Sequence, residues 1–340
     1  MAVTQRTINY DDAFTASADK VWPGVVDQVK NSNPATEYLT RQGRTKESGG
    51  NVVEIMIRRA LNTTVSSYEL FGTINTDRQN DLLTIAHQNR RYIAGSIRYS
   101  PEEEGINSGD EKLADLVTER IEALETDMKE YLSGQLWQFS AGNSGFSPDP
   151  IPLAIISDPT AATSFMGIDP SLETYWRNQR ADSAATTFNG LKREISSLKS
   201  LITRRGGNPD VAICDYETWL TLENALGSLV RIPDKDSVHY GYKADGMLWG
   251  NMMIFADRNV PDAQNQILAT GTPTAGTVYC MDSKYIRLEY VRGLNMKKLP
   301  WQMDANGSDR AMKVLLALNL VVTARRFLGQ LENISQTITA

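Results

Sequence analysis

The sequence has very little of the residues on which disulfide-bonded and metal-binding proteins depend. Its 340 residues include only two cysteines and two histidines. Two cysteines cannot form a disulfide framework or a four-ligand metal site. Both Cys214 and Cys280 lie in apolar, strand-like runs, so we interpret them as small buried hydrophobic residues without a redox role.

The chain also lacks a long hydrophobic run. The longest, from Val314 to Ala324, is interrupted by Asn319 and falls far short of the ~20 residues that span a bilayer. The first residues lack the apolar stretch of a signal peptide. We therefore expect no membrane partner and a protein that stays in the compartment where it is made.

Catalytic motifs are missing as well. The sequence has no phosphate-binding loop, no dinucleotide-binding glycine pattern, no zinc-protease motif and no nucleophile elbow. His87 lies in a strand-like segment and His239 in a polar loop, each isolated. The sequence therefore predicts no enzyme, with no catalytic residue, metal site or cofactor. A hydrolase whose triad comes together only in three dimensions stays open as an alternative of another class.

The charges that are present are distributed unevenly. The net charge is −6, with 41% hydrophobic and 22% charged residues, which is typical of a soluble globular protein. Residues 1–98 contain 12 basic and 10 acidic side chains, whereas residues 99–135 contain 3 basic and 11 acidic ones. Basic doublets are scattered, which argues against sequence-specific DNA binding. Weak contact with phosphates remains open.

The first hundred residues suggest an arm followed by a projecting hairpin. Residues 1–50 are polar and contain breakers at Pro23 and Pro34, so we expect an extended or partly helical arm. Residues 51–61 and 82–99 have strand character, and a mostly polar connection from Asn62 to Asp81 joins them. Loops of this length are uncommon in compact domains unless they have a function.

The rest of the chain predicts a mixed α+β fold. Apolar residues recur at spacings of three and four from Asp110 to Trp137, which predicts a helix roughly 40 Å long with an acidic face. A Gly/Ser/Pro-rich segment from Ser140 to Pro152 is the best candidate for a domain boundary. The remaining expected elements are a helix at 188–202, a strand at 210–214, a helix capped by Asp215, a hairpin within 247–256 that turns at Gly250-Asn251, and strands at 277–281, 285–291 and 313–325.

Several stretches in this order resemble a known family. They are Asn107-Ser108-Gly109 at the start of the long helix, Gly167-Ile168-Asp169-Pro170 followed by Tyr175-Trp176-Arg177-Asn178, Asn208-Pro209-Asp210-Val211-Ala212-Ile213 followed by Tyr216, and Leu248 to Asp257 followed by Pro261. From about residue 50 onward the chain resembles the major capsid proteins of tailed bacteriophages, which have the Hong Kong 97-type capsid fold.

The resemblance implies an α+β capsid fold in five parts. These are an N-terminal arm at 1–45, an extended loop with flanking strands at 46–100, a peripheral domain with a spine helix at 101–184, an axial domain at 185–300, and a return strand of the peripheral domain with the C-terminus at 301–340.

The resemblance also implies a function and partners. The chain would be a virion protein, assembled in the host cytoplasm as pentamers and hexamers into an icosahedral shell around double-stranded DNA. A portal protein and a separate scaffolding protein would be partners, with a decoration protein as an optional one. An encapsulin-like bacterial compartment, which encloses a cargo enzyme, is the nearest alternative.

In this fold the extended loop of one subunit lies across the spine helix of a neighbour. The resemblance therefore implies a contact between basic residues of the loop and acidic residues of the helix, and complementary charges of this kind mainly fix register and orientation. The candidate inter-subunit residues are Arg58, Arg59, Arg90 and Arg91 on the loop and Glu119, Glu122, Glu125 and Asp127 on the helix.

Overall fold

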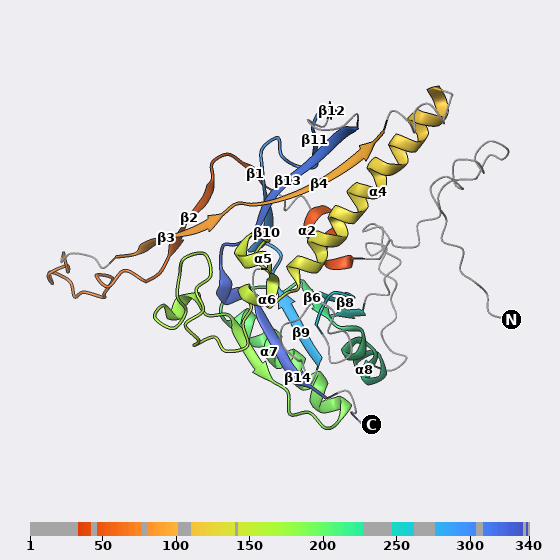
Figure 1. Ribbon diagram of the computed structural model, residues 1–340. Helices are drawn as coiled ribbons and strands as arrows, with labels where there is room; N and C mark the ends of the chain where they lie inside the picture. The colour runs from red at the N-terminus through yellow and green to blue at the C-terminus, as the bar shows by residue number, and fades with distance from the viewer. Residues whose placement is uncertain are drawn as a thin grey trace. The chain divides into compact units, whose positions relative to one another are not determined.

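The computed structural model (Figure 1) describes residues 33–41, 46–76, 81–100, 110–139, 142–226, 247–261, 276–303, 309–335 and 338. The chain divides into two compact units. The described part of unit 1 lies within Ile93–Glu130 and Met296–Leu316, and that of unit 2 within Ser32–Tyr92, Tyr131–Asn295 and Ala317–Ala340. His239 and most of the N-terminal arm lie outside the described residues.

A six-stranded mixed sheet forms the centre of unit 2. Its strand order is β5-β14-β9-β6-β8-β7, with parallel pairing between β5 and β14 and between β6 and β8, and antiparallel pairing elsewhere. The strands are β5 (Gln179–Asp182), β6 (Val211–Cys214), β7 (Met247–Trp249), β8 (Met252–Ala256), β9 (Gly276–Met281) and β14 (Gly329–Ile334). The predicted hairpin is confirmed as β7–β8, where Gly250 takes a φ of +65° that favours glycine.

Two helices cover this sheet and complete its core. The helix α7 (Phe188–Arg204) buries Leu191, Ile195, Leu198 and Ile202, which are spaced by three and four. These side chains share one hydrophobic cluster with residues of β6, β8, β9 and β14 and with Leu222 of α8 (Tyr216–Leu226). Cys214 and Cys280 belong to the same cluster as unpaired thiols, which confirms the interpretation of both as buried hydrophobic residues.

Asp215 caps helix α8, as the sequence predicted. Its carboxylate accepts hydrogen bonds from the Thr218 backbone N–H at 2.9 Å and the Thr218 hydroxyl at 2.6 Å. The side chain is completely buried. Burial raises the pKa of the Asp215 carboxyl above its ordinary value, while the hydrogen bonds from Thr218 and Thr277 oppose this shift.

Asp215→Asn should change how stability depends on pH. A carboxyl with a raised folded-state pKa contributes stability that is fully present below the unfolded pKa and is lost as pH rises through the folded pKa. Asn does not titrate. The free energy of unfolding of the variant, relative to that of the parent, should therefore be lower at about pH 4 than at about pH 7. Denaturant unfolding at both pH values measures this difference. A difference independent of pH would contradict the account.

Unit 2 also contains a second group of strands, which includes the predicted projecting hairpin. The strand β1 (Lys46–Ser48) pairs in parallel with β10 (Ile286–Val291), and β10 pairs antiparallel with the second half of β13 (Arg310–Val322). The strands β2 (Val52–Arg58) and β3 (Leu83–Asn89) form a separate two-stranded sheet. Short helical segments accompany them: α5 (Gly142–Gly145), α6 (Ile151–Ala154), η1 (Thr174–Trp176) and η3 (Arg325–Phe327).

One helix of the arm, which the sequence predicts to be extended or partly helical, packs into unit 2. The helix α2 (Pro34–Arg41) begins at Pro34, a position where proline is tolerated because the first N–H groups of a helix have no partner. The Ala35 N–H donates to the Asp257 carboxylate at 2.9 Å. Tyr38 and Leu39 are buried. Pro34 therefore starts a helix here.

Unit 1 contains most of the long helix. Helix α4 (Asp110–Leu136) confirms the predicted helix, and its residues up to Glu130 belong to this unit. The unit also contains most of β4 (Arg91–Tyr99), β11 (Lys297–Lys298), β12 (Gln302–Met303) and the first half of β13, which pairs antiparallel with β11 and β12. Tyr99 and Trp301 make an edge-to-face contact at 4.9 Å between ring centroids.

The predicted domain boundary at Ser140–Pro152 is wrong, because Tyr131–Asn295 belongs to unit 2 without interruption. The Gly, Ser and Pro residues there accompany the short helices α5 and α6. None of the helices in the described residues has the length and apolar character needed to cross a membrane.

Candidate functional site

The most distinctive feature of unit 2 is the β2–β3 hairpin, which extends away from the rest of the unit (Figure 1). All seven residues of β2 pair with β3, from Val52 opposite Asn89 to Arg58 opposite Leu83. On one face Val53, Ile57 and Ala86 are buried, whereas Met56 and Ile85 on the same strands are exposed. The predicted projecting hairpin is therefore present, with apolar residues on both of its faces.

Beyond the strands, the hairpin presents large apolar side chains to solvent. Phe71 is 98% exposed and Leu70 is 84% exposed. Other exposed apolar residues on the same segment are Leu61, Val65, Tyr68 and Ile74. We call these six residues the apolar tip. Clusters of exposed apolar residues on soluble proteins usually mark interaction sites, so the tip is the best candidate for a contact surface.

Sequence reasoning missed the apolar tip, because it treated Asn62 to Asp81 as a polar connection. Polar residues do outnumber apolar ones in this segment, and average composition hid the five large apolar residues among them. A count of aromatic and aliphatic residues within the loop itself would have found the signal.

At the base of the hairpin, the buried side chains change from one face of the strand to the other. Ala86 and Gln88 of β3 are buried, as is Arg90, which follows the strand, whereas Ile93 is the buried residue near the start of β4. Because side chains alternate strictly along a strand, this change of phase requires a break. The break falls at Arg90, so the single strand predicted for 82–99 is two strands.

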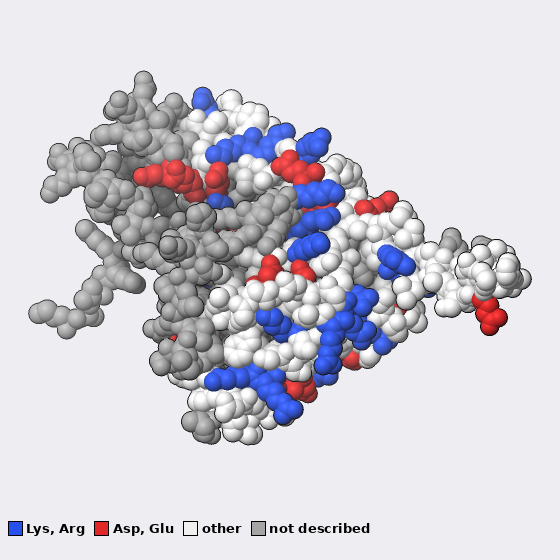
Figure 2. All heavy atoms as spheres, turned by 180° about the vertical axis from the view of Figure 1, so that it is seen from behind, with Lys and Arg blue, Asp and Glu red and all other residues white. Residues whose placement is uncertain are grey.

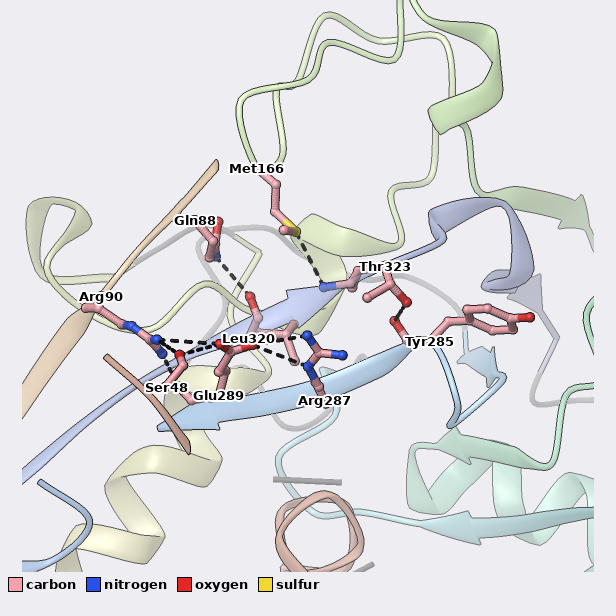
Figure 3. A network of polar contacts seen from close by, with 10 residues as sticks. Ser48, Gln88, Arg90, Met166, Tyr285, Arg287, Glu289, Leu320 and Thr323 are labelled. Atoms are coloured by element: carbon pink, nitrogen blue, oxygen red, sulfur yellow. Dashed lines mark hydrogen bonds and ion pairs between the residues drawn. The ribbon is translucent and has the colours of Figure 1, made fainter. Parts of the chain in front are cut away.

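Arg90 holds this base together through a buried ion pair, seen in Figure 3. Its guanidinium donates to the Glu289 backbone carbonyl at 2.9 Å, and one nitrogen lies 3.5 Å from the Glu289 carboxylate. The Arg90 and Glu289 side chains are 0% and 2% exposed. Ser48 accepts a hydrogen bond from Arg90 and donates one to Glu289. Arg287 also donates to the Glu289 carboxylate, at 3.2 Å.

A second polar network fixes the same region. The Gln88 amide donates to the Leu320 carbonyl at 3.0 Å and to the Asp149 carboxylate. The Asn319 amide donates to the Asn89 carbonyl at 2.7 Å, and its oxygen accepts from the Asp149 N–H at 2.8 Å. These bonds satisfy the buried polar groups at this position. They also explain why Asn319 interrupts the longest apolar run of the sequence.

The four loop arginines have different environments. Arg58 is exposed, and its Nε donates to the Ala60 carbonyl at 3.2 Å. Arg59 lies 3.3 Å from Glu173, and Arg91 lies 3.8 Å from Asp149, each within the same unit. Arg90 is buried, so it does not present its charge to another molecule. This corrects its inclusion among the candidate contact residues, because a buried guanidinium needs its own internal partner.

The four acidic residues of α4 lie in unit 1. Glu119, Glu122 and Asp127 are exposed, and none of these three has an ion pair within the described residues. Glu125 is partly buried and forms an ion pair with Lys298 at 2.8 Å. Three of the four predicted carboxylates therefore present uncompensated charge, while Glu125 is already paired.

Groups suited to chemistry do not gather in the described part of the chain. No set of three or more His, Cys, Asp or Glu residues there has an arrangement that could hold a metal ion. His87 is exposed and lies 3.6 Å from Glu54 on the neighbouring strand. On the face drawn in Figure 2, basic side chains form several separate groups, and the far end of the hairpin is mainly uncharged.

No family model and no curated protein sequence matches the chain. A capsid chain of cyanophage A-1(L) is 14% identical, with a TM-score of 0.71 over 93% of this chain and 97% of the other. A chain from Mycobacterium phage Bobi is 11% identical, with a TM-score of 0.56 over 96% and 98%.

A compartment protein shows the same likeness. A chain of the SrpI encapsulin complex from Synechococcus elongatus is 10% identical, with a TM-score of 0.58 over 95% of both chains. The chain therefore has the fold of phage major capsid proteins, the Hong Kong 97-type fold that the sequence predicted.

Proposed function

We propose that this chain is the major capsid protein of a tailed phage, which assembles into an icosahedral shell around double-stranded DNA. The observation that carries the proposal is the apolar tip on a hairpin with a rigidly held base. Exposed apolar area of this kind is costly for a protein that remains a monomer. A second copy of the chain would cover it in a shell.

The parts of the chain take roles by analogy with the fold. Helix α4 would be the spine helix of the peripheral domain, and residues 46–100 the extended loop. The strands β6, β7, β8 and β9 with α7 and α8 would form the axial domain, within 185–300, and β13 would return to the peripheral domain within 301–340. Pentamers and hexamers of the chain would assemble in the host cytoplasm, with a scaffolding protein, a portal protein and an optional decoration protein as further partners.

Within this proposal, the loop of one subunit meets the acidic face of α4 in a neighbour. We assign this contact to Arg58 on the loop and to Glu119, Glu122 and Asp127 on the helix, because the four other candidates already form ion pairs within the chain. Contacts of this kind are individually weak, about 0–1 kcal/mol for an exposed pair, but a shell repeats them in every subunit.

Arg58→Glu should weaken assembly and leave folding intact. The exposed side chain contributes little to the subunit, so thermal unfolding should hardly change. Assembly followed by light scattering should be reduced at low salt and restored in part near 1 M salt, where the Debye length is about 3 Å. Adding Glu122→Lys should restore assembly better than salt does. Normal assembly of the single variant at low salt would show that this contact is absent.

An encapsulin-like compartment is the second candidate, because an encapsulin chain shares the fold. The higher TM-score of the cyanophage capsid, 0.71 against 0.58, favours the phage. The contents of particles isolated from the native source separate the two. Double-stranded DNA inside the particles supports the capsid, whereas an enclosed enzyme without nucleic acid supports the compartment.

A further inference from the structure

Two basic residues lie over an aromatic pair in unit 2, next to the end of helix α7. The rings of Tyr285 and Phe327 lie 4.5 Å apart between centroids, tilted by 51°. The Lys284 ammonium lies 5.6 Å from the Tyr285 ring, and the Arg326 guanidinium lies 5.5 Å from the Phe327 ring. These distances are typical of cation–π contacts.

The chain that follows α7 lies against Phe327, and the end of the helix carries two more cations. Arg204 and Arg205 are exposed and are followed by Gly206, whose φ is +100°. A Cβ at Gly206 would lie 3.8 Å from the Phe327 ring, and one at Gly207 would lie 2.9 Å from the Phe327 Cβ. The glycines therefore let the chain turn closely against Phe327. We call Arg204, Arg205, Lys284 and Arg326 the basic cluster.

Within the described residues, no ion pair neutralises the basic cluster. None of its four residues has an ion pair in the described part of the chain. The nearby carboxylate of Asp282 is buried and accepts from the backbone N–H groups of Asn208 and Lys284. Arginines at a helix C-terminus also complement the helix dipole, but that effect does not account for Lys284 and Arg326, which come from other elements.

The chemistry of the cluster suits a phosphate backbone better than bases. Three of its four cations are arginines, whose planar fork matches phosphate oxygens. Its two rings are tilted against each other and each has a cation over it, so neither is presented for stacking with an unpaired base. An acidic chain of net charge −6 would repel DNA unless basic groups were gathered locally.

We propose that the basic cluster is a non-specific contact site for the phosphate backbone of duplex DNA. This inference rests on the proposed function, since it places the cluster where a shell subunit meets the packaged genome. Four phosphate contacts predict that the logarithm of the binding constant falls with the logarithm of salt concentration with a slope of about −3.6.

The test uses the full chain as unassembled subunits and a fluorescent random duplex of about 20 base pairs, a length that exceeds the few phosphates one cluster can contact. Fluorescence anisotropy is measured over a salt series. The variant Arg204→Gln/Arg205→Gln/Lys284→Gln/Arg326→Gln should bind much more weakly, with a slope near zero. A control variant removes the same charge from exposed lysines on other elements, Lys46→Gln/Lys129→Gln/Lys297→Gln/Lys313→Gln, and should keep most of the slope.

Three results would overturn the proposal: no binding by the parent, an equal loss in both variants, or competition by polyglutamate as effective as that by unlabelled duplex. The last result would indicate an acidic protein segment as the partner. Thermal unfolding confirms that the variants are folded. Electron microscopy of the cluster variant tests assembly separately, so a failure of DNA binding is distinguishable from a failure to form shells.

Discussion

Arg90→Met should lower the free energy of unfolding by roughly 3 kcal/mol, because it leaves the Glu289 carboxylate buried without its main partner. Removal of one partner from a buried pair typically costs about 3–5 kcal/mol. We expect the lower end, since Arg287 still donates to Glu289. Denaturant unfolding of the unassembled subunit measures the change.

Two further variants make this test specific. Arg58→Met removes an exposed arginine from the same hairpin and should change stability by less than about 0.5 kcal/mol. The double variant Arg90→Met/Glu289→Gln removes both charges and should recover much of the loss, because no uncompensated charge remains buried. If Arg90→Met is as stable as the parent, the buried pair does not anchor the hairpin.

Leu70→Ser/Phe71→Ser should abolish assembly at concentrations at which the parent assembles. Both side chains are almost fully exposed, so the melting temperature of the subunit should hardly change. Burial of each in a contact contributes about 1.5–3 kcal/mol. Their joint loss therefore weakens each contact by roughly 10²- to 10⁴-fold, and sedimentation velocity should show subunits or small capsomers only.

A matched control separates the tip from exposed apolar surface in general. Leu172 is 79% exposed but lies outside the hairpin, so Leu172→Ser removes similar apolar area elsewhere. It should assemble nearly as the parent does. Equal defects in the control and the tip variant would mean that the tip has no special role in assembly.

The parts of the fold that the sequence predicts best are those with strong periodicity or a clear cap. Helix α4 and helix α7 follow from apolar spacings of three and four, and the start of α8 follows from Asp215. The sequence does not reveal where helix α2 begins, because proline usually breaks a helix and Pro34 instead starts one. Short edge strands such as β5 have too few residues to show a period.

The candidate site was predicted in outline but not in its details. The projecting hairpin followed from two strand-like runs with a long connection, and the acidic face of α4 followed from charge counts. The local sequence around Arg90 does not distinguish it from an exposed arginine. Its burial depends on contacts with Ser48 and Glu289, which come from distant segments. Contacts between residues so far apart in the chain leave no local pattern.

Electron cryomicroscopy of the purified protein, alone and with the scaffolding protein proposed as its partner, tests the central claim most directly. The account predicts closed shells with fivefold and sixfold capsomers, in which residues 61–74 of each subunit are covered by a neighbouring copy. A protein that stays monomeric under all these conditions, or shells in which Leu70 and Phe71 remain exposed to solvent, would contradict it.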